Sequence, residues 1–431
     1  MKKDVKEGYK KYEFGLIPND WEVKKIGDIF EDLKCGATPS RAKIEYYNGN
    51  IPWITSGELK YKTIYKTFEN ITENAVKDTN LTIYPKGTFF IAITGLEADG
   101  TRGSCAISGI EATTNQSCLA FRPKIGFCNQ YLYQWYRFYG DYIGLKYTQG
   151  TKQQSLNNKI VGNLEIPVPK LKEQEKIAEI LSTVDEQIEN TEKLIKKNQE
   201  FKKGLMQQLL TKGIGHTEFK KTELGDIPKE WEIKNLDEIS ILIDGDRSNK
   251  YPGEKDIVEN GILFLSTQNI VNSKINYDNC KFISQEKFNE LSKGKLKKDD
   301  LVITLRGSIG NVAKFNGDVY NTGFINAQIM IIRSKNINSN YLSNYLISDC
   351  SQKQIIKISS GSAQPQLTKR ELKKIKVIIP SEKEQKKISV ILSILDKKLE
   401  EYKNKKEKLE LLKKGLMQQL LNGNLRVKYS Y

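Results

Sequence analysis

Lys-Lys-Gly-Leu-Met-Gln-Gln-Leu-Leu occupies residues 202–210 and returns without a change at residues 413–421. The two copies are 211 residues apart in a chain of 431 residues. An identical stretch at this distance indicates an internal duplication, so the chain should consist of two equivalent halves. Each copy closes a long stretch that contains no proline and no glycine except the one inside the repeat.

These stretches, from about residue 171 to 210 and from about residue 381 to 421, carry helical patterns. Their apolar residues recur mostly at spacings of four and three, which predicts a narrow apolar seam on a helix covered with Lys and Glu. The seam residues are Ile177, Leu181, Val184, Ile188 and Ile195 in the first stretch and Ile388, Leu392, Leu395, Leu399 and Tyr402 in the second. One such helix cannot bury its own stripe, so the two should pack together as an antiparallel coiled coil.

The parts before the helices are rich in strand patterns. A Pro-x-x-Trp-Glu motif opens each part, with its tryptophan at Trp21 or Trp231. Short runs of Ile, Tyr, Phe and Thr then alternate with Gly, Asn and Asp, as expected for strands and turns. Residues 131–142 are the clearest helical exception. Each tryptophan is expected to fill the edge of a core, with stacking on a nucleic-acid base as the alternative.

The predicted fold class is therefore α+β: two strand-rich domains separated by two long helices packed as an antiparallel coiled coil, with a pseudo-twofold internal repeat. The predicted boundaries follow from the motifs. They are an N-terminal lead at 1–13, domain 1 at 14–169, spacer helix 1 at 170–212, a hinge at 213–223, domain 2 at 224–379, spacer helix 2 at 380–423 and a C-terminal tail at 424–431.

Composition narrows the functional classes. Lys and Arg number 69 against 53 Asp and Glu, so the formal net charge of +16 favours a polyanionic partner, nucleic acid first. Lysine-rich soluble helices are the alternative source of this excess. No stretch approaches the length of a membrane span, and the charged start has no apolar leader, so a cytoplasmic protein without membrane contact is expected.

Catalytic signatures are absent from the sequence. There is no phosphate-binding glycine loop, no Asn/Asp-Pro-Pro-aromatic motif of an amino-methyltransferase and no metalloprotease or hydrolase motif. The single histidine, His216, leaves little room for chemistry based on that side chain. The six cysteines form no C-x-x-C pair, so they are expected to be reduced core residues rather than metal ligands. A nuclease site made of Asp and Glu residues that are far apart in the sequence remains an alternative.

Polar, glycine-containing clusters recur at matched positions in the two halves. Arg and Lys can bind guanine, Asn and Gln can bind adenine, and glycine turns let backbone amides approach phosphates. The alternative is that these residues only build turns. The candidate DNA contacts are Arg41, Lys43, Thr94, Arg102, Asn115, Gln116, Lys152, Gln153 and Gln154 in the first half, and Arg247, Asn249, Lys250, Gln268, Arg306, Ser308, Asn311, Asn326, Gln328, Ser362, Gln364 and Gln366 in the second.

The halves also share a family resemblance. Each opens with Pro-x-x-Trp-Glu, closes with a glycine- and glutamine-containing turn and a proline, and continues into a Glu-Gln helix, from Glu173 to Asp185 or from Glu384 to Asp396. This arrangement resembles the specificity subunit of type I restriction-modification enzymes over nearly the whole chain. The resemblance implies two target-recognition domains, each binding one half of a bipartite, asymmetric DNA site.

The resemblance further implies that the chain is not itself an enzyme. It would recruit two adenine-N6 methyltransferase subunits and two restriction/translocase subunits, and S-adenosylmethionine, ATP and Mg would be bound by those partners, with no cofactor on this chain. Two identical partners would require the same contact sequence in both halves, and the repeat provides it. Leu205, Met206, Leu416 and Met417 are therefore the candidate partner contacts. The alternative is that these residues only pack in the coiled coil.

Other functions remain open on the residues alone. A coiled-coil scaffold that binds proteins would lack the steep salt dependence of a DNA reader. A self-sufficient nuclease would cut plasmid with magnesium alone. The specificity subunit of a related multi-subunit restriction enzyme is a further alternative.

Overall fold

The computed structural model describes residues 7–30, 32–97, 100–149, 154–359 and 366–428. These residues form two compact units. Unit 1 contains the described residues of Met1–Glu192 and Asn404–Tyr431, and unit 2 contains Lys193–Lys403. The division falls inside both long helices, so each unit holds one half of each.

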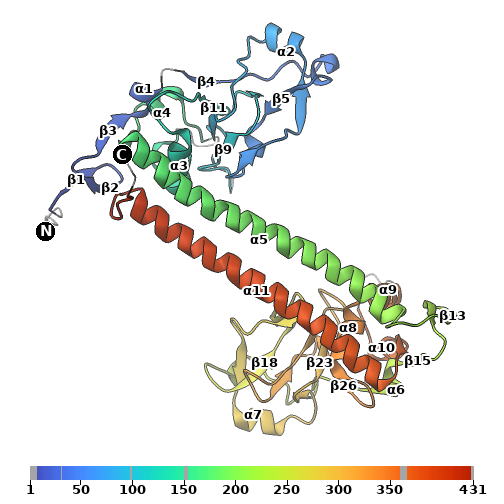
Figure 1. The fold of residues 1–431 in the computed structure, drawn as a ribbon. Coiled ribbons are helices and arrows are strands. Elements are labelled where there is room, and N and C mark those ends of the chain that lie inside the picture. Colours follow the sequence, from blue (N-terminus) through green and yellow to red (C-terminus); the bar gives the residue numbers. More distant parts are fainter. Residues whose placement is uncertain (1–6, 31, 98–99, 150–153, 360–365, 429–431) are drawn as a thin grey trace. The chain divides into compact units, whose positions relative to one another are not determined.

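Unit 1 begins with short strands (Figure 1). Its strands are β1 (Tyr9–Tyr12), β2 (Gly15–Pro18), β3 (Glu22–Lys25), β4 (Leu33–Cys35), β5 (Ile51–Ile54), β6 (Thr63–Ile64), β7 (Glu69–Ile71), β8 (Phe89–Ala92), β9 (Cys105–Ser108), β10 (Thr113–Thr114), β11 (Cys118–Phe121) and β12 (Glu165–Val168). Its helices before the first long helix are α1 (Ile26–Ile29), α2 (Glu73–Asp78), α3 (Asn129–Tyr147) and α4 (Asn158–Gly162).

The larger sheet of unit 1 has the strand order β4-β11-β8-β9-β6, and a second sheet has the order β10-β5-β7. All four residues of β8 are buried, as its unbroken run Phe-Phe-Ile-Ala predicts for a central strand. Helix α3 packs against β8 and β9 with an aromatic face that includes Trp135 and Tyr136. The helix predicted at residues 131–142 is thus confirmed and extends further at both ends.

Unit 2 repeats this plan. Its strands are β13 (Phe219–Thr222), β14 (Gly225–Pro228), β15 (Glu232–Asn235), β16 (Ser240–Asp244), β17 (Ile257–Val258), β18 (Ile262–Leu265), β19 (Ile270–Val271), β20 (Lys274–Ile275), β21 (Lys281–Ile283), β22 (Lys295–Leu296), β23 (Leu301–Thr304), β24 (Val312–Lys314), β25 (Gly323–Ile325), β26 (Ile329–Ser334) and β27 (Lys376–Ile379). Its helices are α6 (Leu236–Ile239), α7 (Gln285–Glu290), α8 (Ser339–Ile347), α9 (Asp349–Ser359) and α10 (Lys369–Leu372). The main sheet orders are β16-β26-β23-β24 and β17-β21-β18-β25-β22.

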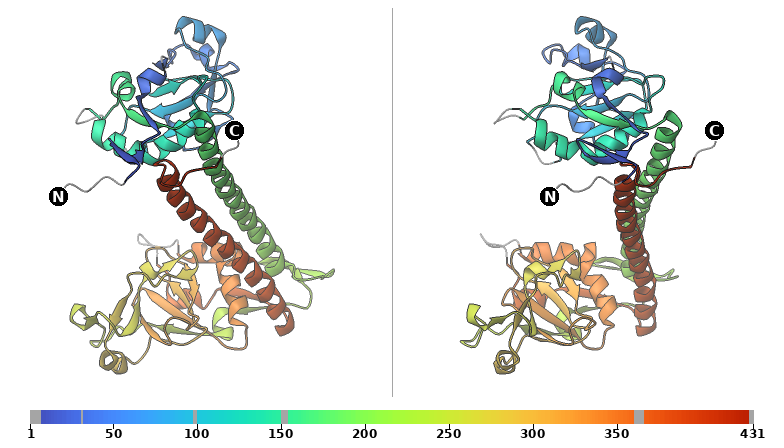
Figure 2. Two further views of the ribbon diagram at one scale, coloured as in Figure 1. Left: turned by 60° about the vertical axis from the view of Figure 1, so that its left-hand side comes forward. Right: turned by 90° about the vertical axis from the view of Figure 1, so that its left-hand side faces the viewer.

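The long helices are α5 (Leu171–Thr211) and α11 (Glu382–Leu420). In unit 1, Lys406 Nζ on α11 lies 2.8 Å from Glu192 Oε1 on α5. In unit 2, Lys202 Nζ on α5 lies 2.5 Å from Asp396 Oδ1 on α11. Residue numbers rise along one helix as they fall along the other, so the helices run antiparallel and side by side within each unit (Figure 2). The predicted fold class is confirmed.

The two repeat copies complete the two cores. Met417, Leu420 and Leu421 are buried in the core of unit 1, and Leu209 and Leu210 are buried in the core of unit 2. The copy at the end of α5 therefore belongs to unit 2, and the copy at the end of α11 belongs to unit 1. Each unit is built from a domain, the helix half that follows it and the end of the other long helix.

Both tryptophans of the Pro-x-x-Trp-Glu motifs lie in the cores and are only 1% exposed. Trp21 Nε1 donates to Glu173 Oε2 at 3.2 Å, and Trp231 Nε1 donates to Glu384 Oε2 at 3.0 Å. The predicted packing role is confirmed, and the glutamate of each Glu-Gln helix holds the indole of its own domain.

The glutamines of the two Glu-Gln pairs have matching roles. The backbone N–H of Cys128, at the start of α3, donates to Gln174 Oε1 at 3.0 Å. The backbone N–H of Asn338, at the start of α8, donates to Gln385 Oε1 at 2.9 Å. Each buried glutamine therefore satisfies a helix N-terminus of its own domain, which explains why the pair occurs in both halves. The domain boundaries themselves stay predictions.

Candidate nucleic-acid interface

A parallel strand pair organises the polar residues of unit 1. Strand β5 pairs with β10 in parallel, with Ile54 opposite Thr114. Because the carboxyl ends of parallel strands meet at one edge, the residues after β5 and those after β10 lie together. The backbone N–H of Asn115 donates to Ile54 O at 3.0 Å, which holds Asn115 and Gln116 at this edge.

Two further segments join this edge. Ile93 N donates to Ser117 O at 2.9 Å, and Leu156 N donates to Ile93 O at 2.8 Å. Thr94 and Ser155 form an antiparallel bridge, which places Gln154 beside them. The structure thus gathers Thr94, Asn115, Gln116 and Gln154 from three distant clusters, a group we name polar edge 1.

Unit 2 builds the same edge on β18 and β25, which are also parallel. Asn326 N donates to Leu265 O at 2.9 Å, and Leu305 N donates to Gln328 O at 2.8 Å. Leu367 N donates to Leu305 O at 2.9 Å and brings the last segment. Each bond repeats one of unit 1. The neighbouring candidate residues form polar edge 2: Gln268, Arg306, Asn326, Gln328 and Gln366.

The two edges share a turn that fixes their shape. Asn115 Oδ1 accepts from Ser117 N at 3.1 Å, and Asn326 Oδ1 accepts from Gln328 N at 3.0 Å. Each asparagine oxygen is therefore used to bend the backbone. The adjoining glutamines, Gln116 and Gln328, are exposed.

Glycine lets another backbone segment cross each edge. A Cβ on Gly36 would lie 1.6 Å from Thr114 O, and one on Gly245 would lie 2.9 Å from Asn326 O. The crossing segments bring in Thr38, whose Oγ1 donates to Gln116 Oε1 at 2.5 Å, and Arg247, whose Nη2 donates to Ala327 O at 3.0 Å. Gly36, Thr38 and Gly245 were not predicted, although a glycine just after a strand is a signal for such a close approach.

Several predicted cations of unit 1 are bound to carboxylates. Arg41 Nη1 and Nη2 donate to Glu69 at 2.6 and 2.8 Å, and this guanidinium lowers the pKa of Glu69. Lys43 Nζ donates to Tyr46 Oη at 2.6 Å and lies 3.7 Å from Asp78. Any DNA contact by these two side chains competes with these partners.

Arg102 is placed differently from its predicted counterpart Arg306. Its Nη1 lies 3.6 Å from Asp141 on α3, and its Cγ would be 2.3 Å from a Cβ on Gly144 of the same helix. Arg102 therefore packs on α3 and is not brought to polar edge 1. Arg306 is exposed.

The other candidates of unit 2 lie in exposed loops. Ser308 and Asn311 follow Arg306, and Asn311 N donates to Thr304 Oγ1 at 3.0 Å. Asn249 and Lys250 are exposed next to Arg247. This loop is held by buried Asp246, whose pKa lies well below its usual range because the backbone amides of Ser248 and Ser292 donate to it. The candidates Lys152, Gln153, Ser362 and Gln364 lie outside the described residues.

The candidate partner contacts separate into surface and core. Leu205, Met206 and Leu416 are half-buried, whereas Met417 is only 7% exposed and lies in the core of unit 1. Exposed apolar residues precede both repeat copies: Phe201 is 58% exposed and Leu412 is 50% exposed. Three residues further, Gly204 and Gly415 face open space.

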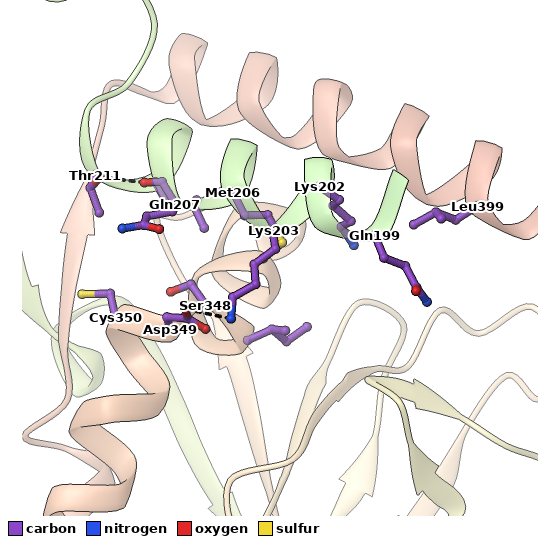
Figure 3. A pocket seen from close by; sticks show the side chains of 12 residues that line it. Gln199, Lys202, Lys203, Met206, Gln207, Thr211, Ser348, Asp349, Cys350 and Leu399 are labelled. Atoms are coloured by element: carbon purple, nitrogen blue, oxygen red, sulfur yellow. Dashed lines mark hydrogen bonds and ion pairs between the residues drawn. The ribbon is translucent and has the colours of Figure 1, made fainter. Parts of the chain in front are cut away.

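A pocket of about 310 Å³ opens beside the first repeat copy in unit 2. Figure 3 shows Lys202, Lys203, Met206 and Gln207 of α5 across from the turn between α8 and α9. Its lining residues are Gln199, Lys202, Lys203, Met206, Gln207, Leu210, Thr211, Ile347, Ser348, Asp349, Cys350 and Leu399. The lining is mainly apolar side-chain stems, so the pocket suits an apolar side chain.

The described residues contain neither a cluster of metal-ligating side chains nor a helix that could span a membrane. Within the ranges that the structure describes, no group of three or more His, Cys, Asp and Glu could hold a metal ion. All six cysteines are free thiols, and complete burial raises the pKa of Cys118 to about 12. No helix in the described part of the chain has the length and apolarity needed to cross a membrane.

Known proteins resemble this chain over nearly its whole length. The family model described as "Type I restriction modification DNA specificity domain" matches twice, at residues 18–198 and 228–411. The chain is similar to two specificity subunits of Methanocaldococcus jannaschii. Type I restriction enzyme MjaVIII specificity subunit is 29% identical over 98% of this chain and 97% of its own length. Putative type I restriction enzyme MjaX specificity subunit is 30% identical over 98% and 97%.

Solved structures show the same fold. The S subunit of a type I system from M. genitalium has a TM-score of 0.60 at 19% identity and covers 95% of this chain and 97% of its own. A chain from a study of complex assembly in a type I restriction-modification system has a TM-score of 0.54 at 15% identity, covering 96% and 100%. With both halves matched by the family model, the chain belongs to the family of type I restriction-modification specificity subunits.

Proposed function

We propose that this chain reads a bipartite, asymmetric site on double-stranded DNA, with one half-site bound at each polar edge. The observation that carries the proposal is the repeated edge: the same backbone bonds gather polar side chains after β5 and β10 and again after β18 and β25. Amide and guanidinium groups are the side chains that discriminate bases in the major groove.

The two polar edges share one backbone arrangement but carry different side chains at matching positions. Arg306 stands on polar edge 2 where polar edge 1 carries Thr94, and Gln268 stands where the first unit carries Gly57. Different side chains on one backbone frame would read different bases. The two half-sites would therefore have different sequences, which makes the full site asymmetric.

The chemistry of modification and cleavage would belong to partners. We propose that two adenine-N6 methyltransferase subunits and two restriction/translocase subunits assemble on this chain in the cytoplasm. S-adenosylmethionine, ATP and Mg would be held by those subunits. The chain itself would neither methylate nor cut DNA.

The exposed apolar residues before the repeat copies support the docking of two identical methyltransferase subunits. Phe201 with Gly204 on α5 and Leu412 with Gly415 on α11 occupy equivalent positions. A glycine with open space around it allows the backbone of a partner helix to approach closely. Leu205, Met206 and Leu416 extend this surface, whereas Met417 is a core residue and would act through folding.

Docking is tested by the stoichiometry of the complex. Phe201→Asp alone and Leu412→Asp alone should each leave one methyltransferase subunit per chain instead of two, measured by native mass spectrometry. Lys196→Asp is the matched control, because Lys196 is exposed on the same helix but lies on a different face from Phe201. Two bound subunits in both apolar variants would contradict the docking surface.

DNA reading is tested by selecting bound or methylated sites from a random library. Arg306→Ala should relax one half-site by about 1–3 kcal/mol of base discrimination. Gln116→Ala should change only the other half-site. A variant that changed both half-sites would contradict the assignment of one edge to each, and a DNA affinity without salt dependence would favour a protein-binding scaffold instead.

A further inference from the structure

Unit 1 carries a short aromatic loop, residues 65–68, between β6 and β7. Two of its four residues are aromatic and open to solvent: Tyr65 is 71% exposed and Phe68 is 83% exposed. A single exposed apolar residue needs no explanation, but two aromatic rings on one tight loop mark a contact surface.

Buried residues and hydrogen bonds fix the backbone of this loop. Ile64 and Thr67 are buried, and Thr67 Oγ1 donates to Asn70 Oδ1 at 2.8 Å. Phe68 N donates at 2.7 Å to the carboxylate of Glu58, which is itself only 6% exposed. The backbone is thus fixed by buried polar bonds while the Phe68 ring stands in water. A backbone that is ordered before a partner arrives reduces the entropy lost on binding.

The loop lies next to polar edge 1. The carboxylate of Glu58 that binds Phe68 N also accepts from Thr55 N at 2.8 Å, at the carboxyl end of β5. Glu69, which follows Phe68, pairs with Trp53 in the register of β5 and β7. Phe68 therefore stands at the same strand ends that hold Asn115 and Gln116.

Three lysines surround the aromatic residues in the sequence: Lys60, Lys62 and Lys66, all of them exposed. Arg41 and Lys43 on the same unit are bound to carboxylates, but no acidic side chain among the described residues forms an ion pair with these three lysines. Uncompensated positive charge around exposed rings complements a polyanion, and DNA offers both phosphates and base faces.

Resting on the proposed function, we infer that Phe68 inserts as an aromatic wedge into a base step at the first half-site, while Lys60, Lys62 and Lys66 hold the flanking phosphates. Apolar wedges of this kind unstack one step and bend the duplex, and the deformation favours sequences with flexible steps. Part of the specificity of unit 1 would then come from DNA shape rather than from base contacts.

Unit 2 lacks the wedge at the matching place. Lys281 pairs with Phe264 as Glu69 pairs with Trp53, so Cys280 occupies the position of Phe68. Cys280 is half-buried, and its Sγ lies 3.2 Å from Asn269 Nδ2. Only the first half-site should therefore be distorted.

The test uses the full chain with its methylating partner and duplexes in which 2-aminopurine replaces single bases across both half-sites. The adenines to be methylated and their direct neighbours are left unreplaced, because a methyltransferase unstacks its own target base. Wild-type protein should raise the fluorescence at one step of the first half-site and at none in the second. Phe68→Ala should abolish this signal and weaken binding about ten-fold, as expected when a stacked ring is removed. Phe68→Leu should keep most of the fluorescence signal and most of the binding affinity.

Ile125→Ala is the matched control, because Ile125 is fully exposed but follows the far end of β11. Replacing Lys60, Lys62 and Lys66 together with Gln should reduce the salt slope of binding by about 3, close to 0.9 for each phosphate that is no longer neutralised.

The outcomes separate the two proposals. Selective DNA binding by wild type with unchanged fluorescence and affinity in Phe68→Ala would overturn the wedge and leave DNA reading intact. Failure of wild type to bind any DNA selectively would overturn the proposed function. If Phe68→Ala released a partner subunit without changing DNA affinity, the loop would be a protein-binding surface and the wedge would be wrong.

Discussion

The nine-residue repeat, residues 202–210 at the end of α5 and 413–421 at the end of α11, packs against different side chains in the two units. In unit 1, Lys413 binds Asp185, and Arg137 Nη1 of α3 lies 2.8 Å from the same carboxylate. In unit 2, Lys202 binds Asp396 in the equivalent way, but Ile347 of α8 takes the position of Arg137. The first junction is closed by a buried charge cluster, and the second opens into the pocket of Figure 3.

The difference comes from the domain side of the junction. Helix α3 is continuous from Asn129 to Tyr147, whereas its counterpart in unit 2 is divided into α8 and α9 at Ser348. Ser348 Oγ donates to Tyr345 O at 2.6 Å and ends the first of these helices. Identical helix sequences therefore do not lead to identical packing. The domain helix that packs against each repeat copy, α3 in unit 1 or α8 and α9 in unit 2, determines whether a pocket remains between them.

Exchanging the two facing residues should give the largest effect. Arg137→Ile leaves Asp185 with one fewer cation in a buried site and should destabilise unit 1 by about 3–5 kcal/mol. Ile347→Arg places a guanidinium in a pocket that contains room and a carboxylate, so its effect should stay within about 1 kcal/mol. Urea denaturation measures both, because Trp21, Trp53 and Trp135 report on unit 1 and Trp231 on unit 2. Equal losses in the two variants would contradict the comparison.

The methionines of the two repeat copies test the same difference between a filled junction in unit 1 and an open pocket in unit 2. Met417 is buried in the core of unit 1, so Met417→Ala should cost about 2–4 kcal/mol. Met206 lines the open pocket, and Met206→Ala should cost about 1 kcal/mol or less because its side chain is only partly packed. Thermal unfolding of the two single variants, with Leu411→Ala on the exposed face of α11 as control, decides the order.

Much of this arrangement could be predicted from the sequence, for identifiable reasons. The helix pair follows from the repeat and its seam, because helical periodicity is a local signal. The polar edges follow from three clusters that recur at offsets of 211 or 212 residues. The burial of Met417, in contrast, depends on packing against residues more than two hundred positions away, and the position of Arg102 depends on the space above Gly144. Such tertiary packing leaves no periodic trace in one sequence.

The charge cluster of unit 1 should make stability depend on pH. Burial, with repulsion from Arg137, lowers the pKa of Lys413 to about 8. Between about pH 8 and the usual pKa near 10.5, the folded chain has released this proton while the unfolded chain retains it, so stability should rise with pH. The rise should be about 1–3 kcal/mol. It should disappear in Lys413→Met, measured as the difference in urea midpoint between the two proteins at each pH; parallel profiles would contradict it.

The segments that follow the long helices give the smallest expected contrast. Arg426 donates to Glu173 at 2.9 Å and to Asp20 at 2.9 Å, whereas His216 Nε2 lies 3.0 Å from Glu384. Arg426→Ala removes several bonds to charged groups but from a partly exposed site, so about 1–2 kcal/mol should be lost from unit 1. His216→Ala should cost less than about 1 kcal/mol, because Trp231 and Ile214 still donate to Glu384. Calorimetry of the two variants compares them, and a larger loss for His216→Ala would reverse the prediction.

The swapped placement of the repeat copies sets an order of events during synthesis. Unit 2 is a continuous segment, Lys193–Lys403, and can close its core as soon as that segment has left the ribosome. Unit 1 cannot, because Met417, Leu420 and Leu421 are made after the whole of unit 2 and must join Ile177 and Leu181. The first domain to be translated is therefore the second to be finished. Until then it exposes an unfilled apolar site, which makes unit 1 the part of a nascent chain most in need of chaperones.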